Sequence, residues 1–229
     1  MAEKVLFTWS GGKDSALALY ELQKDPCFEI SALLTTVTKD CDRLGMHGVR
    51  SILIEQQAES MDLPLQKIYI ATDCSNDFYE RTMKQLLEHY QSEGVAAVAF
   101  GDIFLKDVRE YREQNLRQLG LKSIFPLWGR STADLADLFI KLGFNAITTC
   151  VDSHFLDKKF LGRDFDADFL DELPPKVDPC GENGEFHTFV FNGPSFRRRL
   201  TFKRGEIFFR DNRFHICDLL PHQNPTVRP

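Results

Sequence analysis

The residues Ser10-Gly11-Gly12-Lys13-Asp14-Ser15 combine the groups that a phosphate-binding loop needs. Two adjacent glycines let the backbone turn tightly and bring its N–H groups close to an anion. Serine hydroxyls and the Lys13 ammonium can donate hydrogen bonds to phosphate oxygens, and Asp14 could hold Mg²⁺ or shape the loop. We therefore interpret Ser10 to Ser15 as the segment that binds the polyphosphate of a nucleotide.

This loop stands where a strand is expected to give way to a helix. The apolar run 5–9 precedes it, and apolar residues recur with helical spacing over 12–24. The positive end of the helix dipole would add to the attraction for an anion. A plain strand-to-helix turn is the alternative, but it would need only the glycines. Because only Gly12 stands beside the lysine and an aspartate follows, the spacing disfavours a simple γ-phosphate-transfer enzyme.

The first part of the chain has the rhythm of an α/β domain with a parallel sheet. Up to about residue 150, short apolar runs alternate with longer amphipathic ones. We predict one domain over 1–150, with helices on both faces of the sheet. The expected strands are 5–9, 30–37, 66–71, 96–100, 123–125 and 146–151. The expected helices are 12–24, 48–61, 76–93, 106–119 and 132–142.

A second, smaller α+β domain is predicted over 151–229. Here the sequence becomes rich in Asp, Phe and Pro, and prolines at 174, 175 and 179 mark loops. Four runs alternate well enough for antiparallel strands: 186–191, 198–202, 207–210 and 213–219. The cluster Arg197-Arg198-Arg199 is interpreted as a solvated strand edge, with an anionic partner as the alternative.

Other polar residues follow the expected strands of the first domain. Gly101 and Asp102 come directly after 96–100, so Asp102 is expected at the carboxyl end of the parallel sheet, where ligands bind. A helix N-cap is the alternative role for Asp102. Leu34 and Thr35 end the second strand in the same layer, where their backbone could meet adenine. His47 precedes a helix and could equally be a cap or a packed residue.

The segment from Gly181 to Thr188 offers two carboxylates, a histidine and a hydroxyl among glycines. Glu182, Glu185 and His187 could bind ammonium, position an amine or accept a proton from a nucleophile. A β-turn with solvated polar side chains is the alternative from the residues alone.

Composition limits the remaining classes. The formal net charge of -6 disfavours a broad nonspecific nucleic-acid surface. Six scattered cysteines without a Cys-x-x-Cys pair indicate neither a zinc site nor a disulfide framework, and we expect most of them to be buried. The first apolar run is too short for a signal peptide or a membrane span, so we expect a cytoplasmic protein with no membrane partner.

The order Ser-Gly-Gly-x-Asp-Ser after a first strand resembles the pyrophosphate loop of the N-type ATP pyrophosphatases, in the adenine nucleotide alpha-hydrolase superfamily. The resemblance implies a HUP-type domain that splits ATP between its α- and β-phosphates with Mg²⁺. It also implies an adenylated substrate oxygen that a nitrogen or sulfur nucleophile then attacks. In these terms Ser10 to Ser15, Leu34, Thr35, Met46, His47, Gly101 and Asp102 would bind ATP.

Further segments resemble one branch, the diphthine-ammonia ligase-like (diphthamide synthase) family. That branch implies an amide-forming ligase acting with ammonium on diphthine, which an elongation factor carries. Lys13, Asp14, Glu182, Glu185 and His187 would then be catalytic, with Asp14 also a ligand of Mg²⁺. The substrate would meet Glu182, Asn183, Gly184, Glu185, His187 and Thr188. The segments that carry the resemblance are 46–50, 57–58, 101–103, 126–128 and 181–188.

The chain departs from the diphthamide-making pattern at Asn183 and His187, where a glycine and a glutamate are more usual. A sister group with this version is suspected of forming an amide in cobalamin salvage, so a small acid such as a corrinoid is the second acceptor. Two further functions compete with amide formation: a tRNA-modifying pyrophosphatase, which the acidic balance disfavours, and a nucleotide-binding sensor without catalysis. The sequence is compatible with a homodimer.

Overall fold

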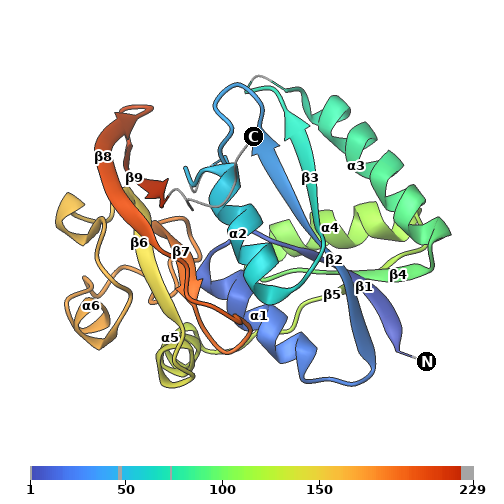
Figure 1. The fold of residues 1–229 in the computed structure, drawn as a ribbon, viewed down its shortest axis with the longest axis horizontal. Coiled ribbons are helices and arrows are strands. Elements are labelled where there is room, and N and C mark those ends of the chain that lie inside the picture. The colour runs from blue at the N-terminus through green and yellow to red at the C-terminus, as the bar shows by residue number, and fades with distance from the viewer. Residues whose placement is uncertain (1, 46–47, 73, 223–229) are drawn as a thin grey trace.

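The computed structural model describes residues 2–45, 48–72 and 74–222. Figure 1 shows a parallel sheet on the right, an antiparallel sheet on the left, and two helices packed between them. This arrangement matches the expected fold class, an α/β domain with a smaller C-terminal part.

The parallel sheet has the strand order β3-β2-β1-β4-β5 within the described residues. All of its paired strands run parallel, as expected. The central strand β1 is covered on both faces, because Val5, Leu6 and Phe7 are fully buried. Burial of a strand on both faces requires a continuous apolar run, which is the signal in the sequence. The strands are β1 (Glu3–Thr8), β2 (Phe28–Thr38), β3 (Leu65–Ile70), β4 (Val95–Ala99) and β5 (Lys122–Ile124).

Helices cover both faces of this sheet (Figure 1). On the side facing the antiparallel sheet lie α1 (Lys13–Gln23) and α2 (Ser51–Met61). On the other side lie α3 (Asn76–Ser92) and α4 (Lys106–Gln118). Ser75 caps α3 by accepting a hydrogen bond from the Phe78 N–H at 3.3 Å.

The C-terminal part holds an antiparallel sheet with the order β7-β6-β9-β8 in the described chain. Its strands are β6 (Asn145–Asp152), β7 (Phe186–Asn192), β8 (Phe202–Arg210) and β9 (Phe214–Pro221). Around it lie α5 (Thr132–Lys141), α6 (Ala167–Asp171) and the short 3-10 helix η1 (Lys158–Phe160).

The strand expected at 146–151 exists, but its assignment to the parallel sheet was wrong. It is part of β6, which pairs antiparallel with β7 and β9. The residues of β6 from Ala146 to Asp152 are all buried. A strand buried on both faces has the same apolar pattern in either kind of sheet, so the sequence could not distinguish them. The two sheets therefore divide between β5 and β6.

The strand expected at 198–202 is also wrong. Arg198 and its neighbours form an irregular segment whose Arg197 and Arg198 side chains make ion pairs with Asp62 and Glu59, both at 2.5 Å. The segment expected at 207–210 is the second half of β8. The register of β8 shifts between Arg204 and Ile207, and this irregularity interrupts the alternation that the prediction relied on.

One cluster of buried residues joins the two halves. It includes Phe7 of β1 and Leu17 of α1 together with Phe186 and Phe189 of β7. Because the core is shared, the antiparallel sheet is held in place by the same burial that stabilises the parallel one.

All six cysteines fall within the described ranges and are free thiols. Cys150, Cys180 and Cys217 are buried, but Cys27 and Cys41 are exposed, so the expectation that most are buried was wrong. Among the described helices, none is long and apolar enough to cross a membrane.

Candidate active site

A cavity of about 900 Å³ opens at the carboxyl ends of β1, β2 and β4. This volume suits a nucleotide and part of a second substrate. Both halves of the molecule contribute to it. Of the residues expected to bind ATP or substrate, the lining includes Ser10, Gly12, Lys13, Asp14, Ser15, Leu34, Thr35, Gly101, Asp102, Glu182, Gly184, His187 and Thr188.

The phosphate loop, Ser10 to Ser15, is closed on itself by its two serines. Gly12 N–H donates to Ser10 Oγ at 3.2 Å, and the two serine hydroxyl oxygens lie 3.0 Å apart. Ser15 Oγ also donates to the Gly12 carbonyl at 3.0 Å. Gly12 is the N-cap of α1 and has no side-chain cap of its own. The N-terminus of α1 therefore faces the cavity with the polarity that attracts a phosphate.

The buried Gln57 side chain of α2 holds this loop against the antiparallel sheet. Its amide oxygen accepts from Trp9 Nε1 at 2.8 Å, and its amide nitrogen donates to the Gly11 carbonyl at 3.0 Å. The same nitrogen donates to Val190 O at 2.6 Å, and Val190 N–H donates to the Gly11 carbonyl at 2.9 Å. The sequence reasoning gave Gln57 no role. Two signals were available: a polar residue on the buried face of an expected helix, and the place of Gln57 in the segment 57–58 that carries the family resemblance.

Replacing Gly11 by alanine is predicted to lower the free energy of unfolding strongly. Its φ is +77°, and an added Cβ would lie 2.5 Å from Ile54 Cδ1. Left-handed strain and overpacking together should cost about 3 kcal/mol of unfolding free energy. Gly129 is the matched control, since its φ is +72° and an added Cβ there would meet no atom within 4 Å. Gly129→Ala should therefore lose only about 1 kcal/mol in urea unfolding. Equal losses for the two variants would contradict the steric argument.

Lys13 turns toward the C-terminal part of the chain. Its Nζ donates to Asp14 Oδ2 at 2.8 Å and to the carbonyl oxygen of Cys180, and it lies 5.0 Å from the centre of the Phe186 ring. The side chain is only 3% exposed. Burial opposes a charged ammonium, but the charge and hydrogen bond of Asp14, together with the neighbouring Cys180 and Glu182, raise the pKa of Lys13 above its usual value. Lys13 thus links the phosphate loop to the segment that begins at Cys180.

Glu182 approaches the phosphate loop from that segment. Its Oε1 accepts from Ile103 N–H at 2.7 Å, directly after Asp102. Burial raises the pKa of Glu182 to about 7, and the nearby charges of Asp14 and Asp102 act in the same direction. A carboxylate with such a pKa can accept and release a proton near neutrality. In the same segment Thr188 Oγ1 accepts from Lys13 N–H at 3.0 Å.

Glu185 and Asn183 are placed differently from the expectation, because neither belongs to the described lining of the cavity. Glu185 is 2% exposed, and its Oε1 accepts from Asp178 N–H at 3.1 Å and from Asn183 Nδ2 at 3.0 Å. These bonds shape the turn directly before β7, in which Glu182 lies. His187, in β7, does line the cavity.

Asp102 lies at the carboxyl end of β4, as predicted. Its carboxylate forms an ion pair with Arg112 of α4 at 2.9 Å, and the Arg112 guanidinium lies 4.4 Å from the centre of the Phe100 ring. The alternative role as a helix cap was wrong, since Leu105 is the N-cap of α4. Gly101 passes close to the phosphate loop, where an added Cβ would meet Ser15 N at 3.0 Å.

Leu34 and Thr35 of β2 line the cavity, but they do not end the strand as expected, because β2 continues to Thr38. Within the described residues, the buried Thr35 Oγ1 has no hydrogen-bond partner. A buried hydroxyl in this state favours a ligand that supplies the missing bond. Met46 and His47, the other residues expected near the nucleotide, lie outside the described residues.

Family models match both parts of the chain. The diphthamide synthase N-terminal domain matches residues 3–123, and the diphthamide synthase C-terminal domain matches residues 131–219. The chain belongs to the diphthamide synthase family. The match to the first model includes the phosphate loop, and the match to the second includes the segment from Gly181 to Thr188.

Curated proteins that are similar in sequence to this chain align with most of it. A diphthine–ammonia ligase of Schizosaccharomyces pombe is 30% identical over 89% of this chain and 37% of its own length. The human diphthine–ammonia ligase is 31% identical over 67% of this chain and 63% of its own. The mouse protein of the same name is 31% identical over 86% and 82%. The chain thus spans little more than a third of the yeast relative and just under two thirds of the human one.

Proposed function

We propose that this protein is an ATP-dependent ligase that converts a carboxylate of its substrate to an amide. The observation that carries the proposal is that the phosphate loop and Glu182 line the same cavity. Lys13 connects the two, because its side chain contacts Asp14 in the loop and the Cys180 carbonyl in the segment that carries Glu182. A loop of N–H groups and hydroxyls suits the polyphosphate of ATP, and a carboxylate with a pKa of about 7 suits proton transfer.

In the first step, an oxygen of the substrate carboxylate attacks the α-phosphorus of ATP. The bond to the β-phosphate oxygen breaks, and pyrophosphate leaves with an acyl-adenylate remaining. The N-terminus of α1 and the serine hydroxyls of the loop stabilise the negative charge that develops on the pyrophosphate. The charge of the buried Lys13 side chain, on the lining of the same cavity, reinforces this field.

In the second step, ammonia attacks the carbonyl carbon of the adenylate, and the bond to the AMP oxygen breaks. Ammonia must lose a proton to become a neutral amide. Glu182 is the proposed acceptor, because it lines the cavity and its raised pKa suits this role. His187 lies on the same lining and is the second candidate for handling this proton.

Mg²⁺ is part of this proposal. Mg²⁺ commonly binds through substrate phosphates and one or two carboxylates, so a dedicated protein cage is unnecessary. The described residues contain no cluster of three His, Cys, Asp or Glu residues that could hold a metal. Asp14, on the cavity lining, would supply the protein ligand. When bound, the ion would neutralise charge on the leaving pyrophosphate.

Diphthine on an elongation factor is the proposed acceptor, since the relatives are named diphthine–ammonia ligases. The test is to incubate the purified protein with ATP, Mg²⁺ and ammonium, and to follow pyrophosphate and AMP. One arm supplies an elongation factor that carries diphthine, and a second arm supplies a corrinoid acid. Stoichiometric AMP and a mass change for amide formation in the first arm are the expected results. If neither acceptor stimulates the release of pyrophosphate, the proposed class of acceptor, a carboxylate of this kind, is overturned.

A further inference from the structure

The segment that follows β2, of which residues 39–45 and 48–50 are described, contributes Leu44 and Gly45 to the lining of the cavity. We call it the wall loop. Its ends come together as a narrow hairpin, in which Arg43 forms β-bridges with Thr38 and with Arg50. Leu44 N–H donates to the Val49 carbonyl at 2.8 Å.

The wall loop is held by Asp218 of β9. Asp218 Oδ1 accepts from Arg43 Nη1 at 2.7 Å and from Arg50 Nε at 3.0 Å, and Oδ2 accepts from Arg50 Nη2 at 2.6 Å. Arg43 Nη1 also donates to the Gly48 carbonyl at 2.7 Å. One carboxylate thus fixes both strands of the hairpin.

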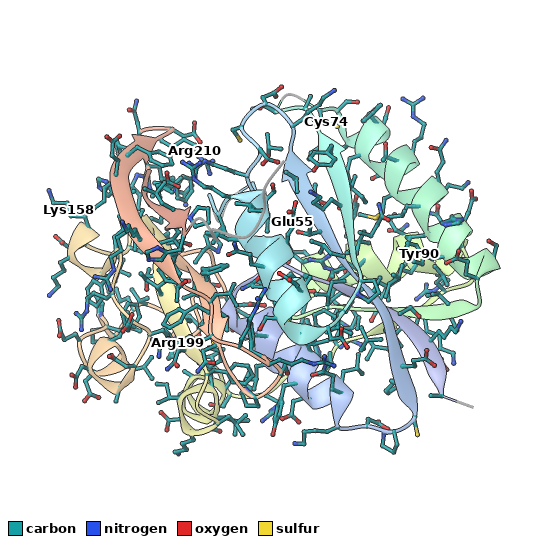
Figure 2. The ribbon with its side chains drawn as sticks, in the orientation of Figure 1. Glu55, Cys74, Tyr90, Lys158, Arg199 and Arg210 are labelled. Carbon is teal, nitrogen blue, oxygen red and sulfur yellow. The ribbon has the colours of Figure 1, made fainter. Side chains whose placement is uncertain are left out.

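Two further contacts press the wall loop against the antiparallel sheet. Arg210 of β8, labelled in Figure 2, donates from Nη1 to the Gly45 carbonyl at 3.1 Å. Gly48 has a φ of +65°, and a Cβ there would lie 2.7 Å from Ile216 Cγ2 of β9. These contacts account for Gly48 and Arg50 in the sequence segment 46–50, which the phosphate site leaves unexplained.

The hydrogen bonds of Asp218 join an ionised carboxylate to ionised guanidinium groups, which makes them stronger than bonds between neutral groups. Burial alone would raise the pKa of Asp218, but the hydrogen bonds and charges of Arg50 and Arg43 lower it to about 2. The carboxylate is therefore ionised at every pH at which the protein would work. The pair with Arg50 is bidentate, which fixes orientation as well as distance.

We propose that Asp218 is a positioning residue for the nucleotide, which acts by holding the wall loop against the cavity through Arg43 and Arg50. Strand β9 of the antiparallel sheet would then help set the affinity for ATP, although Asp218 is not among the described residues that line the cavity. This inference rests on the proposed function only in taking the cavity as the ATP site.

The test measures ATP binding by titration calorimetry, without any acceptor, for the wild type and for Asp218→Asn. Asparagine keeps the size of the side chain but loses the charge that holds two guanidinium groups. We expect the Kd for ATP to rise about tenfold, equivalent to about 1.4 kcal/mol. In turnover, KM for ATP should rise by a similar factor while kcat changes less than twofold. Asp218→Glu, which retains the charge, should recover part of the lost affinity.

Glu172→Gln is the matched control. Glu172 also forms a bidentate pair with one arginine, Arg163, at 2.9 and 3.0 Å, but it lies outside the described lining of the cavity. The affinity of Glu172→Gln for ATP should equal that of the wild type. Hydrogen exchange supplies a second measurement, since the Leu44 and Gly48 amides should exchange faster in Asp218→Asn than in the wild type.

The outcomes separate two failures. If the wild type itself binds no ATP, the proposed function fails. If the wild type binds ATP and Asp218→Asn binds it equally well, the positioning role fails and Asp218 only joins the two parts of the fold. Should Asp218→Asn not fold, Arg50→Lys tests the same contact, because lysine keeps the charge but cannot form the bidentate pair. An unchanged Kd in that variant would equally overturn the inference.

Discussion

Replacing Lys13 by methionine is expected to lower pyrophosphate release by about 10²–10³-fold, the usual cost of removing a charge-stabilising group from an active site. Methionine can still pack against the Phe165 and Phe186 rings, but it cannot donate to Asp14 or to the Cys180 carbonyl. The phosphate loop then loses a positive charge and the side-chain link to the segment that carries Glu182, while the bond from Lys13 N–H to Thr188 Oγ1 remains.

The measurement is the rate of pyrophosphate release with ATP and acceptor both saturating. Lys24→Met is the control, since Lys24 also lies over an aromatic ring, Tyr20, at 5.2 Å, but at the far end of α1 from the phosphate loop. It should keep the wild-type rate. If Lys13→Met also keeps a rate within a few fold of the wild type, then Lys13 has no role in the chemistry.

Replacing Glu182 by glutamine should abolish most amide formation above neutral pH while leaving adenylation measurable. Loss of a general base typically costs about 10²–10⁴-fold. In the wild type, the base is the ionised carboxylate, so at a fixed concentration of free ammonia the rate of the second step should rise with pH and level off above a pH of about 7. The variant should lack this rise. The expected signature is pyrophosphate release without a matching yield of amide.

Hydroxylamine provides the rescue test, because its nitrogen is less basic than that of ammonia, so the proton that it carries after attack is more acidic and depends less on a protein base. It should restore product formation in Glu182→Gln. A variant that still shows the wild-type pH profile with ammonium would remove Glu182 from the role of proton acceptor and leave His187 as the candidate.

Glu182→Gln is expected to stabilise the fold although it lowers activity. The pKa of Glu182 is raised in the folded protein, so ionisation of the group works against folding. Its unfavourable contribution is absent at low pH, grows as pH rises from the ordinary glutamate range to about 7, and is complete above that. Because the side chain is partly exposed, we expect Glu182→Gln to gain only about 1–2 kcal/mol of unfolding free energy at pH 8. Urea unfolding at pH 5 and pH 8 measures this gain, which should be small at pH 5.

The sequence was most informative where the signal is local. A strand, paired glycines and the start of a helix are neighbours in the chain, so the position of Ser10 to Ser15 between β1 and α1 could be predicted from sequence alone. Asp102 was located by the same logic, since a polar residue that follows an apolar strand falls at the carboxyl edge of a parallel sheet.

The remaining features depend on residues far apart in the chain. Lys13 was expected to point at phosphate, but its direction is decided by a carbonyl 167 positions away. Glu185 was expected in the active site, yet the turn geometry around Asp178 and Asn183 buries it behind Glu182. Asp218 gave no signal, because an acid in an amphipathic strand is ordinary until its two arginine partners are known.

The hydrogen bond from Val190 N–H to the Gly11 carbonyl has a consequence for how this protein can be divided. The backbone of β7 completes the nucleotide loop from outside the parallel sheet, so residues 2–130 do not contain all that the loop requires. A fragment ending there would present the Ser-Gly-Gly motif without the partner that gives it shape. The two family domains are therefore better regarded as halves of one structural unit than as independent modules.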